Sequence, residues 1–365
     1  MIFDPKYTIT SSLASYLLEV VRHNEALDIL PITAQLIASL RETSRLKSTH
    51  YSTQIEGNAL TQKEVNAIAN GKKGEFAGRE RDELEVNNYF LALEYLENEI
   101  QNDTNVSEKL IQKLHGLVLK GSKKISPYRE AQNVIRDGST GRIVYMPPEA
   151  KDVKPMMKSL VVWLNDQMKK KEIPAPIIAA LIHYQFATIH PYFDGNGRTA
   201  RLLTTFALHK MGYGMQGIYS LEEYYAKNLQ GYYKALTIGN HNYYDGRETS
   251  DATPFVHYFI HGMSVSFRSA REKAQELQSQ QMQAPITTKN VRDLNAQQRQ
   301  ILSLFMKQKE VNTADVAHHL GIKSRSAYSL IKKWIDQDFV LVVDASRKAR
   351  TYGLTTEWEI VVNQS

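Results

Sequence analysis

The sequence predicts an all-α protein with one small β-hairpin near its middle and a compact module at its end. Apolar residues recur every three or four positions over most of the 365 residues, which is the spacing of one buried helix face. This pattern is interrupted at 131–149, and the composition becomes rich in glutamine at 276–290. The two interruptions mark where the architecture is expected to change.

Helices are predicted along the first third of the chain from apolar spacing and from capping residues. Thr61 followed by Glu64 forms a capping box, so one helix should start near residue 62. Ser107 is a suitable N-cap for a later helix. The predicted helices in this part cover 8–23, 32–48, a segment beginning near 62, 79–100 and 107–119.

The segment 131–149 predicts a β-hairpin. Two short β-forming runs flank the turn sequence DGSTG, and Pro147 and Pro148 end the second run. Helical spacing then resumes, and Gly212 is expected to stop one of the later helices. The predicted helices in this part cover 152–170, 176–189, 198–211, 221–239 and 253–275.

The last part of the chain predicts a winged helix. Three helices are expected over 295–307, 313–320 and 324–337, followed by two strand-forming runs around the basic loop DASRKAR. This is the element order of a helix-turn-helix with a wing. The predicted domains are therefore 1–105 for an N-terminal helical region, 106–275 for a catalytic core, 276–290 for a linker and 291–365 for the winged-helix module.

The composition limits the classes of function. The chain has no cysteine, so disulfides, thiolate catalysis and cysteine metal sites are excluded. The absence of cysteine fits a reducing cytoplasm, which is the expected location. The longest apolar run, 175–182, is too short to cross a bilayer, so no membrane association is expected. The net charge of +6 is spread along the chain and is weak support for a polyanionic partner.

The stretch HPYFDGNGRTAR, residues 190–201, gathers several reactive groups in one loop between two predicted helices. The preceding helix, 176–189, is almost wholly apolar and should be buried. Pro191 disfavours helical geometry at His190, so that helix should end there. The next helix is not expected to start before Gly197. A loop between two packed helices can hold its side chains in fixed positions.

The second half of this loop predicts a polyphosphate site. Two glycines around an asparagine allow positive φ, so backbone N–H groups can face an anion at the start of a helix. Arg198 and Arg201 are three residues apart, so both project from one side of the first helical turn. Two guanidiniums beside such a turn favour a polyphosphate over a carboxylate.

The remaining groups complete a site for phosphate chemistry. Asp194 can hold a divalent cation that bridges phosphate oxygens. His190 is the group here whose pKa is ordinarily near neutrality, so it is the candidate general base. The loop therefore predicts nucleotidyl or phosphoryl transfer to a hydroxyl. The alternative is a purely structural turn, and it becomes less plausible as more of these groups occur together.

The run resembles the signature of the Fic family, His-Pro-Phe-x-Asp/Glu-Gly-Asn-Gly-Arg-x-x-Arg. The matching residues are His190, Pro191, Tyr192, Phe193, Asp194, Gly195, Asn196, Gly197, Arg198, Thr199, Ala200 and Arg201. The one departure is Tyr192, where the family usually has phenylalanine. The tyrosine keeps an aromatic anchor and adds a hydroxyl that needs a partner. The resemblance covers most of 1–275 and implies the helical-bundle core of the family.

The resemblance also implies an activity. A protein of this kind transfers AMP from ATP to a Ser, Thr or Tyr hydroxyl of a protein, with magnesium. By that likeness His190 deprotonates the hydroxyl and Asp194 binds magnesium. Arg198 holds the β-phosphate and Arg201 the γ-phosphate. The α- and β-phosphates are held by Asn196 and by the amides that flank it, at Gly195 and Gly197.

The segment YSTQIEGNAL, residues 51–60, resembles the inhibitory motif of the same family. Ser52 and Glu56 are four residues apart, which places them on one face of a short helix that Gly57 should end. A Glu56 carboxylate could pair bidentately with Arg201 and occupy the place of the γ-phosphate. The motif therefore predicts autoinhibition. A water positioned by the same carboxylate would let the site also remove AMP, which is a further hypothesis.

Two other segments are predicted to contact substrates. The 131–149 hairpin resembles the family's flap, and Ile143 and Tyr145 are the candidates to hold an extended target segment. The alternative is a small structural hairpin. In SPYRE, just upstream, Tyr128 and Arg129 are interpreted as structural. Downstream, the tyrosine-rich helix EEYYAKNLQGYYKAL provides Asn228 and Tyr232 as candidates for the adenine site, although most of its tyrosines are expected to be packing residues.

The C-terminal module supports a second hypothesis, a DNA-binding transcription regulator with an inactive core. The segment KSRSAYSLIKKW would enter the major groove, and Arg347, Lys348 and Arg350 would touch phosphate. However, 290–365 holds 11 Lys and Arg against 8 Asp and Glu, a small surplus for a nucleic-acid surface. An interaction or dimerisation role is the alternative. Self-modification and a homodimer are both compatible with the sequence.

Overall fold

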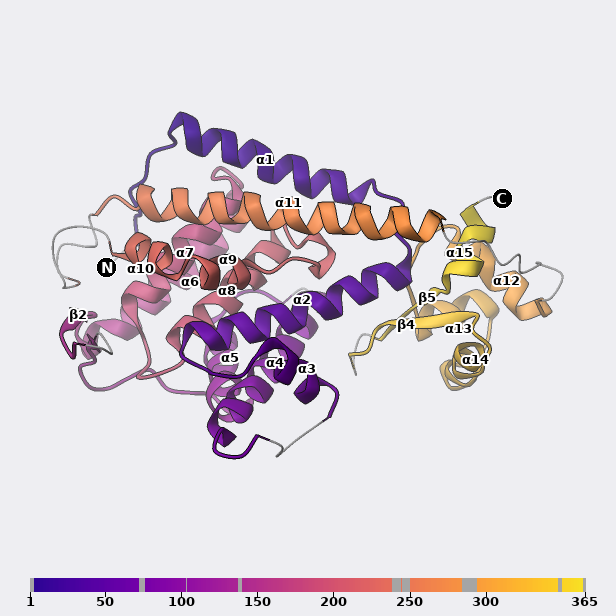
Figure 1. Ribbon diagram of the computed structural model, residues 1–365, viewed down its shortest axis with the longest axis horizontal. Coiled ribbons are helices and arrows are strands. Elements are labelled where there is room, and N and C mark those ends of the chain that lie inside the picture. The colour runs from indigo at the N-terminus through magenta and orange to yellow at the C-terminus, as the bar shows by residue number, and fades with distance from the viewer. Residues whose placement is uncertain are drawn as a thin grey trace. The chain divides into compact units, whose positions relative to one another are not determined.

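The computed structural model describes residues 3–71, 76–102, 104–136, 140–237, 244, 250–283, 294–346 and 350–363. The chain is mostly helical, and the strands in these ranges are few and short (Figure 1). It divides into two compact units. The first contains 1–28 and 44–269, and the second contains 29–43 and 270–365. The predicted all-α class with a small hairpin is confirmed.

The first unit contains the elements predicted before the glutamine-rich segment. The hairpin strands are antiparallel, and Ile135 lies opposite Tyr145. The elements of this part of the chain are α1 (Ser11–Asp28), α2 (Ala34–Ile55), α3 (Gln62–Ala69), α4 (Glu80–Gln101), α5 (Glu108–Lys120), β1 (Ile135–Arg136), β2 (Ile143–Tyr145), α6 (Ala150–Lys170), α7 (Ala175–Ile189), α8 (Asn196–Lys210), the 3₁₀ turn η1 (Met215–Gly217), α9 (Leu221–Lys227), α10 (Leu229–Leu236) and α11 (Thr253–Gln283).

The helix α7 lies at the centre of the first unit. Thirteen of its 15 residues are buried, as its apolar sequence predicts. Its neighbours α4, α5, α6 and α8 contribute to the same apolar core, which includes Leu114, Met157, Phe186 and Phe206. Because α7 is packed on every side, the residue at its C-terminal end is held by a rigid support.

Several predicted boundaries are wrong. The helix that begins near residue 32 continues to Ile55, so Ser52 lies in α2 and not in a separate short helix. The predicted helix 221–239 is broken at Asn228, whose φ of −127° and ψ of 46° are not helical. The helix α8 starts at Asn196, one residue before the earliest start expected. The helix α11 runs to Gln283, into the predicted linker.

The second unit contains the three helices and two strands predicted for the end of the chain, together with two further elements. They are α12 (Ala296–Phe305), β3 (Val311–Asn312), α13 (Thr313–Leu320), α14 (Ser324–Asp336), β4 (Val340–Asp344), β5 (Thr351–Leu354) and α15 (Thr356–Asn363). The strand β3 and the helix α15 were not predicted. The sheet is antiparallel with the order β3-β5-β4, and Gly321 takes the left-handed conformation expected for the turn between α13 and α14.

A core of its own stabilises this part of the second unit. Buried side chains from α12, α14 and both longer strands meet there, including Ile301, Ile331, Trp334 and Tyr352. The start of α2 also belongs to this unit: the Ala34 N–H donates to the Glu359 carboxylate at 3.1 Å. In the described ranges, no helix is long and apolar enough to span a bilayer.

Candidate active site

The loop between α7 and α8 holds His190 at a helix end. His190 is the C-cap of α7 and has the left-handed φ of 50°, so the chain turns there as Pro191 predicts. Its Nδ1 lies 3.3 Å from the Ala187 carbonyl oxygen. A carbonyl can only accept, so Nδ1 carries the proton, and Nε2 is left with a lone pair. The ring is therefore in the tautomer that a general base requires.

The loop is closed by hydrogen bonds from its own residues. The Asn196 side chain accepts from the Tyr192 N–H at 3.0 Å and donates to the Tyr192 carbonyl at 2.8 Å. Gly195 has a φ of 75° and is the N-cap of α8, so the glycine is required there. Both polar atoms of the Asn196 carboxamide therefore already bond to the backbone of the loop. Phosphate binding by Asn196 and by the Gly195 and Gly197 amides stays a prediction.

His115, on α5, packs against this loop and bonds to its backbone. Its ring stacks on the Tyr192 ring with centroids 3.4 Å apart and an angle of 6°. Its Nε2 donates to the Asp194 carbonyl at 2.8 Å, and its Nδ1 accepts from the Ser126 hydroxyl at 2.7 Å. The Tyr192 hydroxyl is buried and has no hydrogen-bond partner among the described residues. The sequence predicted a hydrogen-bond partner for this hydroxyl, and the described residues provide none.

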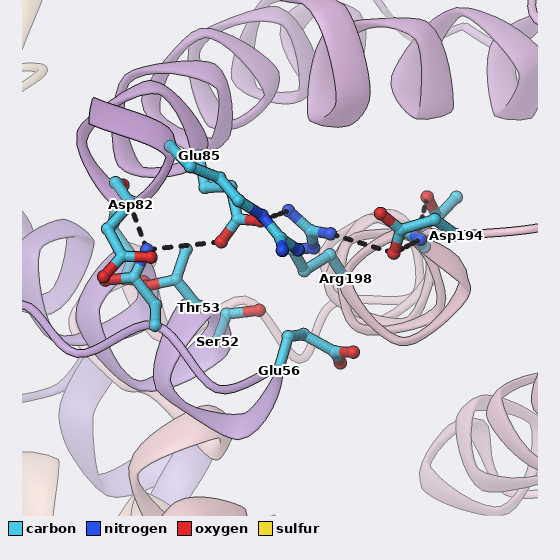
Figure 2. Close-up of polar contacts among 12 residues, drawn as sticks. Ser52, Thr53, Glu56, Asp82, Glu85, Asp194 and Arg198 are labelled. Atoms are coloured by element: carbon cyan, nitrogen blue, oxygen red, sulfur yellow. Dashed lines mark hydrogen bonds and ion pairs between the residues drawn. The ribbon is translucent and has the colours of Figure 1, made fainter. Parts of the chain in front are cut away.

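Asp194 and Arg198 form the part of the site that could meet a metal and phosphates. The Asp194 side chain is 58% exposed, and its Oδ1 lies 3.2 Å from the Arg198 Nη2. Arg198 is buried, and its Nη1 is 3.7 Å from Glu85 on α4 (Figure 2). The Arg198 Nε is buried with no hydrogen-bond partner in the described ranges. Such an unsatisfied donor is what a phosphate-binding arginine would show without its ligand.

Arg201 is held by the end of α2. Its Nε donates to the Ser52 hydroxyl and its Nη2 to the Ser52 carbonyl, both at 2.8 Å. Nη2 also donates to Glu56 Oε1 at 2.9 Å. The predicted pairing of Arg201 with Glu56 is therefore present, but one Glu56 oxygen takes part, so the predicted bidentate geometry was wrong. The two hydrogen bonds from Arg201 to Ser52 were not predicted. Ser52 occupies the Nε of Arg201, and the Nη1 is buried with no hydrogen-bond partner in the described ranges, so Nη2 alone reaches Glu56.

Glu56 also lies against the backbone of α8. A Cβ placed on Gly197 would overlap the Glu56 carboxylate, so the glycine allows the close approach. Burial lowers the pKa of Arg201, but the Glu56 carboxylate together with Tyr232 and Tyr89 raises it, and the net result is a pKa above the ordinary value. Arg201 therefore stays charged, and Glu56 occupies space beside the predicted phosphate cradle.

Burial controls the protonation of three histidines around the site. It lowers the pKa of His115 and of His190 to about 4 and the pKa of His183 to about 3. The Ala187 hydrogen bond and the Glu56 carboxylate raise the pKa of His190, but by less than burial lowers it. All three rings are therefore neutral at pH 7. For His190, this means that the lone pair on Nε2 is available without prior deprotonation.

These three pKa values predict loss of stability in mild acid. The unfolded chain binds the protons near pH 6.5 and the folded chain does not, so stability is complete above that pH and falls as pH drops toward 4. Each histidine should cost about 2 kcal/mol at pH 5, and the unfolding temperature should fall by on the order of 10 °C from pH 7.5 to pH 5. Thermal unfolding followed by circular dichroism measures this.

The control for that measurement is His318→Gln, because His318 lies exposed on α13. This variant should keep the full pH dependence, whereas His115→Gln should reduce it. An unfolding temperature that is the same at pH 7.5 and pH 5 would contradict the prediction.

The hairpin is anchored to the core by one of its predicted docking residues. Tyr145 is 7% exposed, and its hydroxyl donates to the Thr188 carbonyl of α7 at 2.7 Å. Ile143 is half-buried, and Val144 between them is 42% exposed. Target contact by Ile143 and Tyr145 stays a prediction, and the exposed face of the strand at Val144 is the one open to a partner.

The predicted adenine residues lie in different surroundings. Asn228 is exposed at the break between α9 and α10. Tyr232 is 3% exposed, stacks on Tyr225 and shares a 2.8 Å hydrogen bond with His183. Adenine binding by Asn228 and Tyr232 stays a prediction. Tyr233 is 49% exposed, and its hydroxyl donates to the Ile55 carbonyl at 3.3 Å, directly before Glu56.

Sequence reasoning missed several residues of the site. Glu85 pairs with Arg198, His115 supports the loop, and Tyr233 is the exposed member of its tyrosine pair. Arg129, interpreted as structural, donates to the carbonyl of His190 at 3.0 Å. The sequence carries no local signal for Glu85 or His115, because both lie far from the loop along the chain. Tyr232 and Tyr233 are adjacent on α10 and point in different directions. The apolar spacing of this helix could have shown that one of them is buried and the other exposed.

The residues around Asp194 fit a metal ion that is bound mainly by the phosphates of a substrate and less by the protein. No group of three or more His, Cys, Asp or Glu side chains in the described structure could hold a metal ion by itself. Magnesium is commonly bound by one or two carboxylates together with substrate phosphates. An exposed Asp194 carboxylate beside two buried arginines is compatible with that arrangement.

Comparison with known proteins gives consistent matches. Residues 105–208 match the family model described as Fic/DOC family. A protein named protein adenylyltransferase Fic from Drosophila willistoni is 31% identical over 165 residues, 45% of this chain and 32% of that protein. One with the same name from Nematostella vectensis is 30% identical over 213 residues, 57% of this chain and 44% of that protein. The chain therefore spans less than half the length of these relatives.

Solved structures share the fold. A Fic family protein from Desulfovibrio desulfuricans aligns with a TM-score of 0.58 at 23% identity, covering 97% of this chain and 99% of that one. A Fic domain containing signalling protein from Bacteroides thetaiotaomicron aligns with a TM-score of 0.62 at 23% identity, covering 72% and 97%. The helical core expected from the signature is thereby confirmed as a fold.

Proposed function

Because residues 105–208 of this chain form a Fic/DOC family domain, we propose that the protein transfers AMP from ATP to a Ser, Thr or Tyr hydroxyl of a protein. The observation that carries the proposal is the loop after α7. Its imidazole is neutral at pH 7, and the helix that follows the loop carries two buried guanidiniums, one of which is bonded to Glu56. A base together with a site for a polyphosphate is what nucleotidyl transfer requires.

In the proposed reaction His190 acts on the acceptor. Its Nε2 takes the proton of the target hydroxyl, and the hydroxyl oxygen attacks the α-phosphorus of ATP. The new oxygen–phosphorus bond forms as the bond from the α-phosphorus to the bridging oxygen breaks, and pyrophosphate leaves. The Nδ1 hydrogen bond to Ala187 keeps the ring in the tautomer that accepts at Nε2.

The arginines hold the leaving group. Arg198 would take the β-phosphate with the Nε that is unsatisfied here, and Arg201 would take the γ-phosphate. The first N–H groups of α8 have no intrahelical acceptor and would favour an anion near the start of this helix. These contacts fix the α-phosphorus opposite His190.

Magnesium is part of the proposal. Asp194 would hold it through its exposed carboxylate, which gives up its pairing with Arg198 when phosphates arrive. When bound, the ion would neutralise charge that develops on the phosphate oxygens.

Glu56 would make the enzyme autoinhibited. The carboxylate bonds to Arg201 and lies against Gly197, so a γ-phosphate would meet both a like charge and occupied space. Removal of AMP from a modified protein, with a water positioned by Glu56, is included in the proposal. Comparing AMP release by the native chain and by Glu56→Gly tests that part.

The test of the proposed activity uses labelled ATP and magnesium. The native chain and its Glu56 and His190 variants are incubated alone and with cell extract, and mass spectrometry identifies each carrier of added AMP. Self-modification would appear without extract. A Glu56→Gly protein that binds ATP and labels nothing in either setting would exclude the proposed activity.

A DNA-binding role for the C-terminal module is the second candidate. Its specific support is the face of α14, where Arg325, Lys332 and Lys333 are exposed. Among the predicted wing residues, Arg350 is exposed, and Arg347 and Lys348 lie outside the described residues. We assign the module as a winged helix on its element order.

The DNA hypothesis predicts a salt-dependent gel shift. Duplex DNA should be retarded by the full chain at about 50 mM salt and released by about 200 mM, because binding through phosphates depends steeply on salt. Lys332→Glu should weaken the shift, and Glu42→Gln, on α2, should not. No retardation at low salt would favour an interaction role for the module.

A further inference from the structure

Arg129 precedes the hairpin and is buried, with 4% exposure. In the described structure its guanidinium contacts are all backbone carbonyl oxygens. Nε donates to His190 at 3.0 Å, Nη1 to Ala131 at 3.1 Å, and Nη2 to Pro148. Its own backbone N–H donates to the Pro191 carbonyl at 2.9 Å. The buried positive charge of Arg129 is therefore stabilised by backbone carbonyl groups.

The acceptors of Arg129 belong to two different parts of the site. Ala131 and Pro148 flank the β1–β2 hairpin at its two ends. His190 and Pro191 begin the catalytic loop. One side chain therefore ties both ends of the hairpin to the residue that carries the imidazole. The planar guanidinium can donate in three directions at once, and a lysine ammonium cannot reproduce that geometry.

We propose that Arg129 is a positioning residue that fixes His190 relative to the hairpin, so that an acceptor held by the hairpin meets the imidazole Nε2. The inference rests on the proposed AMP transfer. It assigns Arg129 no contact with ATP, because each of its three guanidinium nitrogens already donates to a backbone carbonyl. Arg129 should therefore govern the chemical step more than nucleotide binding.

The charge of Arg129 provides a second, independent signature. Burial lowers the pKa of His190, and the Arg129 cation lowers it further. The Ala187 hydrogen bond, Glu56 at the end of α2 and Asp194 in the loop act in the opposite direction. Removing the cation should raise the pKa of His190, whereas exchanging it for another cation should not.

The experiment uses the full chain with Glu56→Gly as the parent, so that inhibition does not hide the effect. Arg129→Lys keeps the charge and loses the three-way geometry, and Arg129→Gln loses both. We expect each to reduce the rate of AMP transfer at saturating ATP by tenfold or more, with ATP affinity by calorimetry within twofold of the parent. Arg299→Lys is the matched control, because the Arg299 Nε also donates to a carbonyl, of Leu294 at 2.9 Å.

Titration of the His190 ring by NMR, assigned with His190→Ala, separates charge from geometry. Arg129→Gln should raise the pKa of His190, and Arg129→Lys should leave it near the parent value. A Lys variant as active as the parent overturns the proposal. So does a loss of ATP affinity that matches the loss of rate, since that indicates a merely structural role. If the parent itself transfers no AMP, the proposed function fails, and an unshifted His190 in Arg129→Gln then overturns this inference separately.

Discussion

Replacing Glu56 with glycine should raise AMP transfer by about 10- to 100-fold. The carboxylate makes a 2.9 Å hydrogen bond to Arg201 and lies against Gly197. A hydrogen bond to a charged group contributes about 1.5–3 kcal/mol, and each 1.4 kcal/mol corresponds to about tenfold. Without Glu56 the Nη2 of Arg201 keeps its hydrogen bond to the Ser52 carbonyl, but its second N–H becomes available to a phosphate, and the space beside Gly197 opens.

The measurement is the initial rate of label incorporation from ATP, into the chain itself and into proteins of an extract. Glu56→Gln tests charge against volume, since the amide keeps the size and loses the charge. It should fall between the native chain and Glu56→Gly. Glu42→Gln, on the exposed side of α2, should match the native rate. Equal labelling by Glu56→Gly and the native chain would show that Glu56 is not the inhibitor.

Replacing His190 with alanine in the Glu56→Gly chain should reduce AMP transfer by about 10²–10⁴-fold, the range for loss of a general base. ATP affinity should be unchanged, because the proposed mechanism assigns His190 to the acceptor and not to the phosphates. The fall in unfolding temperature between pH 7.5 and pH 5 should be smaller than in the parent, because one histidine with a pKa of about 4 is removed.

Initial rates and calorimetry with ATP measure the two effects separately. His318→Ala, on the surface of α13, is the control for loss of a histidine. The regulator hypothesis makes the opposite prediction, that His190→Ala changes no measurable activity. A His190→Ala chain with the parent rate would therefore remove His190 from the proposed mechanism.

The order of helices and the catalytic loop could be predicted because their signals are local. Apolar spacing locates α7, and Pro191 explains the end of that helix at His190. Ser52 and Glu56 are four residues apart, so they were expected on the same side of a helix, and this expectation does not depend on how long the helix is. The length itself was wrong, because no breaker separates residues 48 and 55 and the helix continues through both.

The support around the loop could not be predicted from one sequence. Arg129 and His190 are 61 residues apart, and His115 and Asp194 are 79 apart. Their contact depends on how α5, the hairpin and α7 pack, which local patterns do not encode. The adenine candidates were difficult for another reason. Tyr232 and Tyr233 are adjacent, so a shift of one residue in helix phase exchanges the buried ring for the exposed one.

The burial of α7 on all sides limits how the proposed activity could be controlled. A helix with 13 buried residues of 15 cannot tilt or slide without disrupting the core around it. The imidazole at its end is therefore in place at all times, whether or not substrates are present. In the proposed mechanism, a switch would therefore act on the C-terminal end of α2, which contacts Arg201, or on the hairpin strand that is predicted to hold the acceptor. Activation would then require Glu56 to leave the proposed nucleotide site, and it would require no movement of His190.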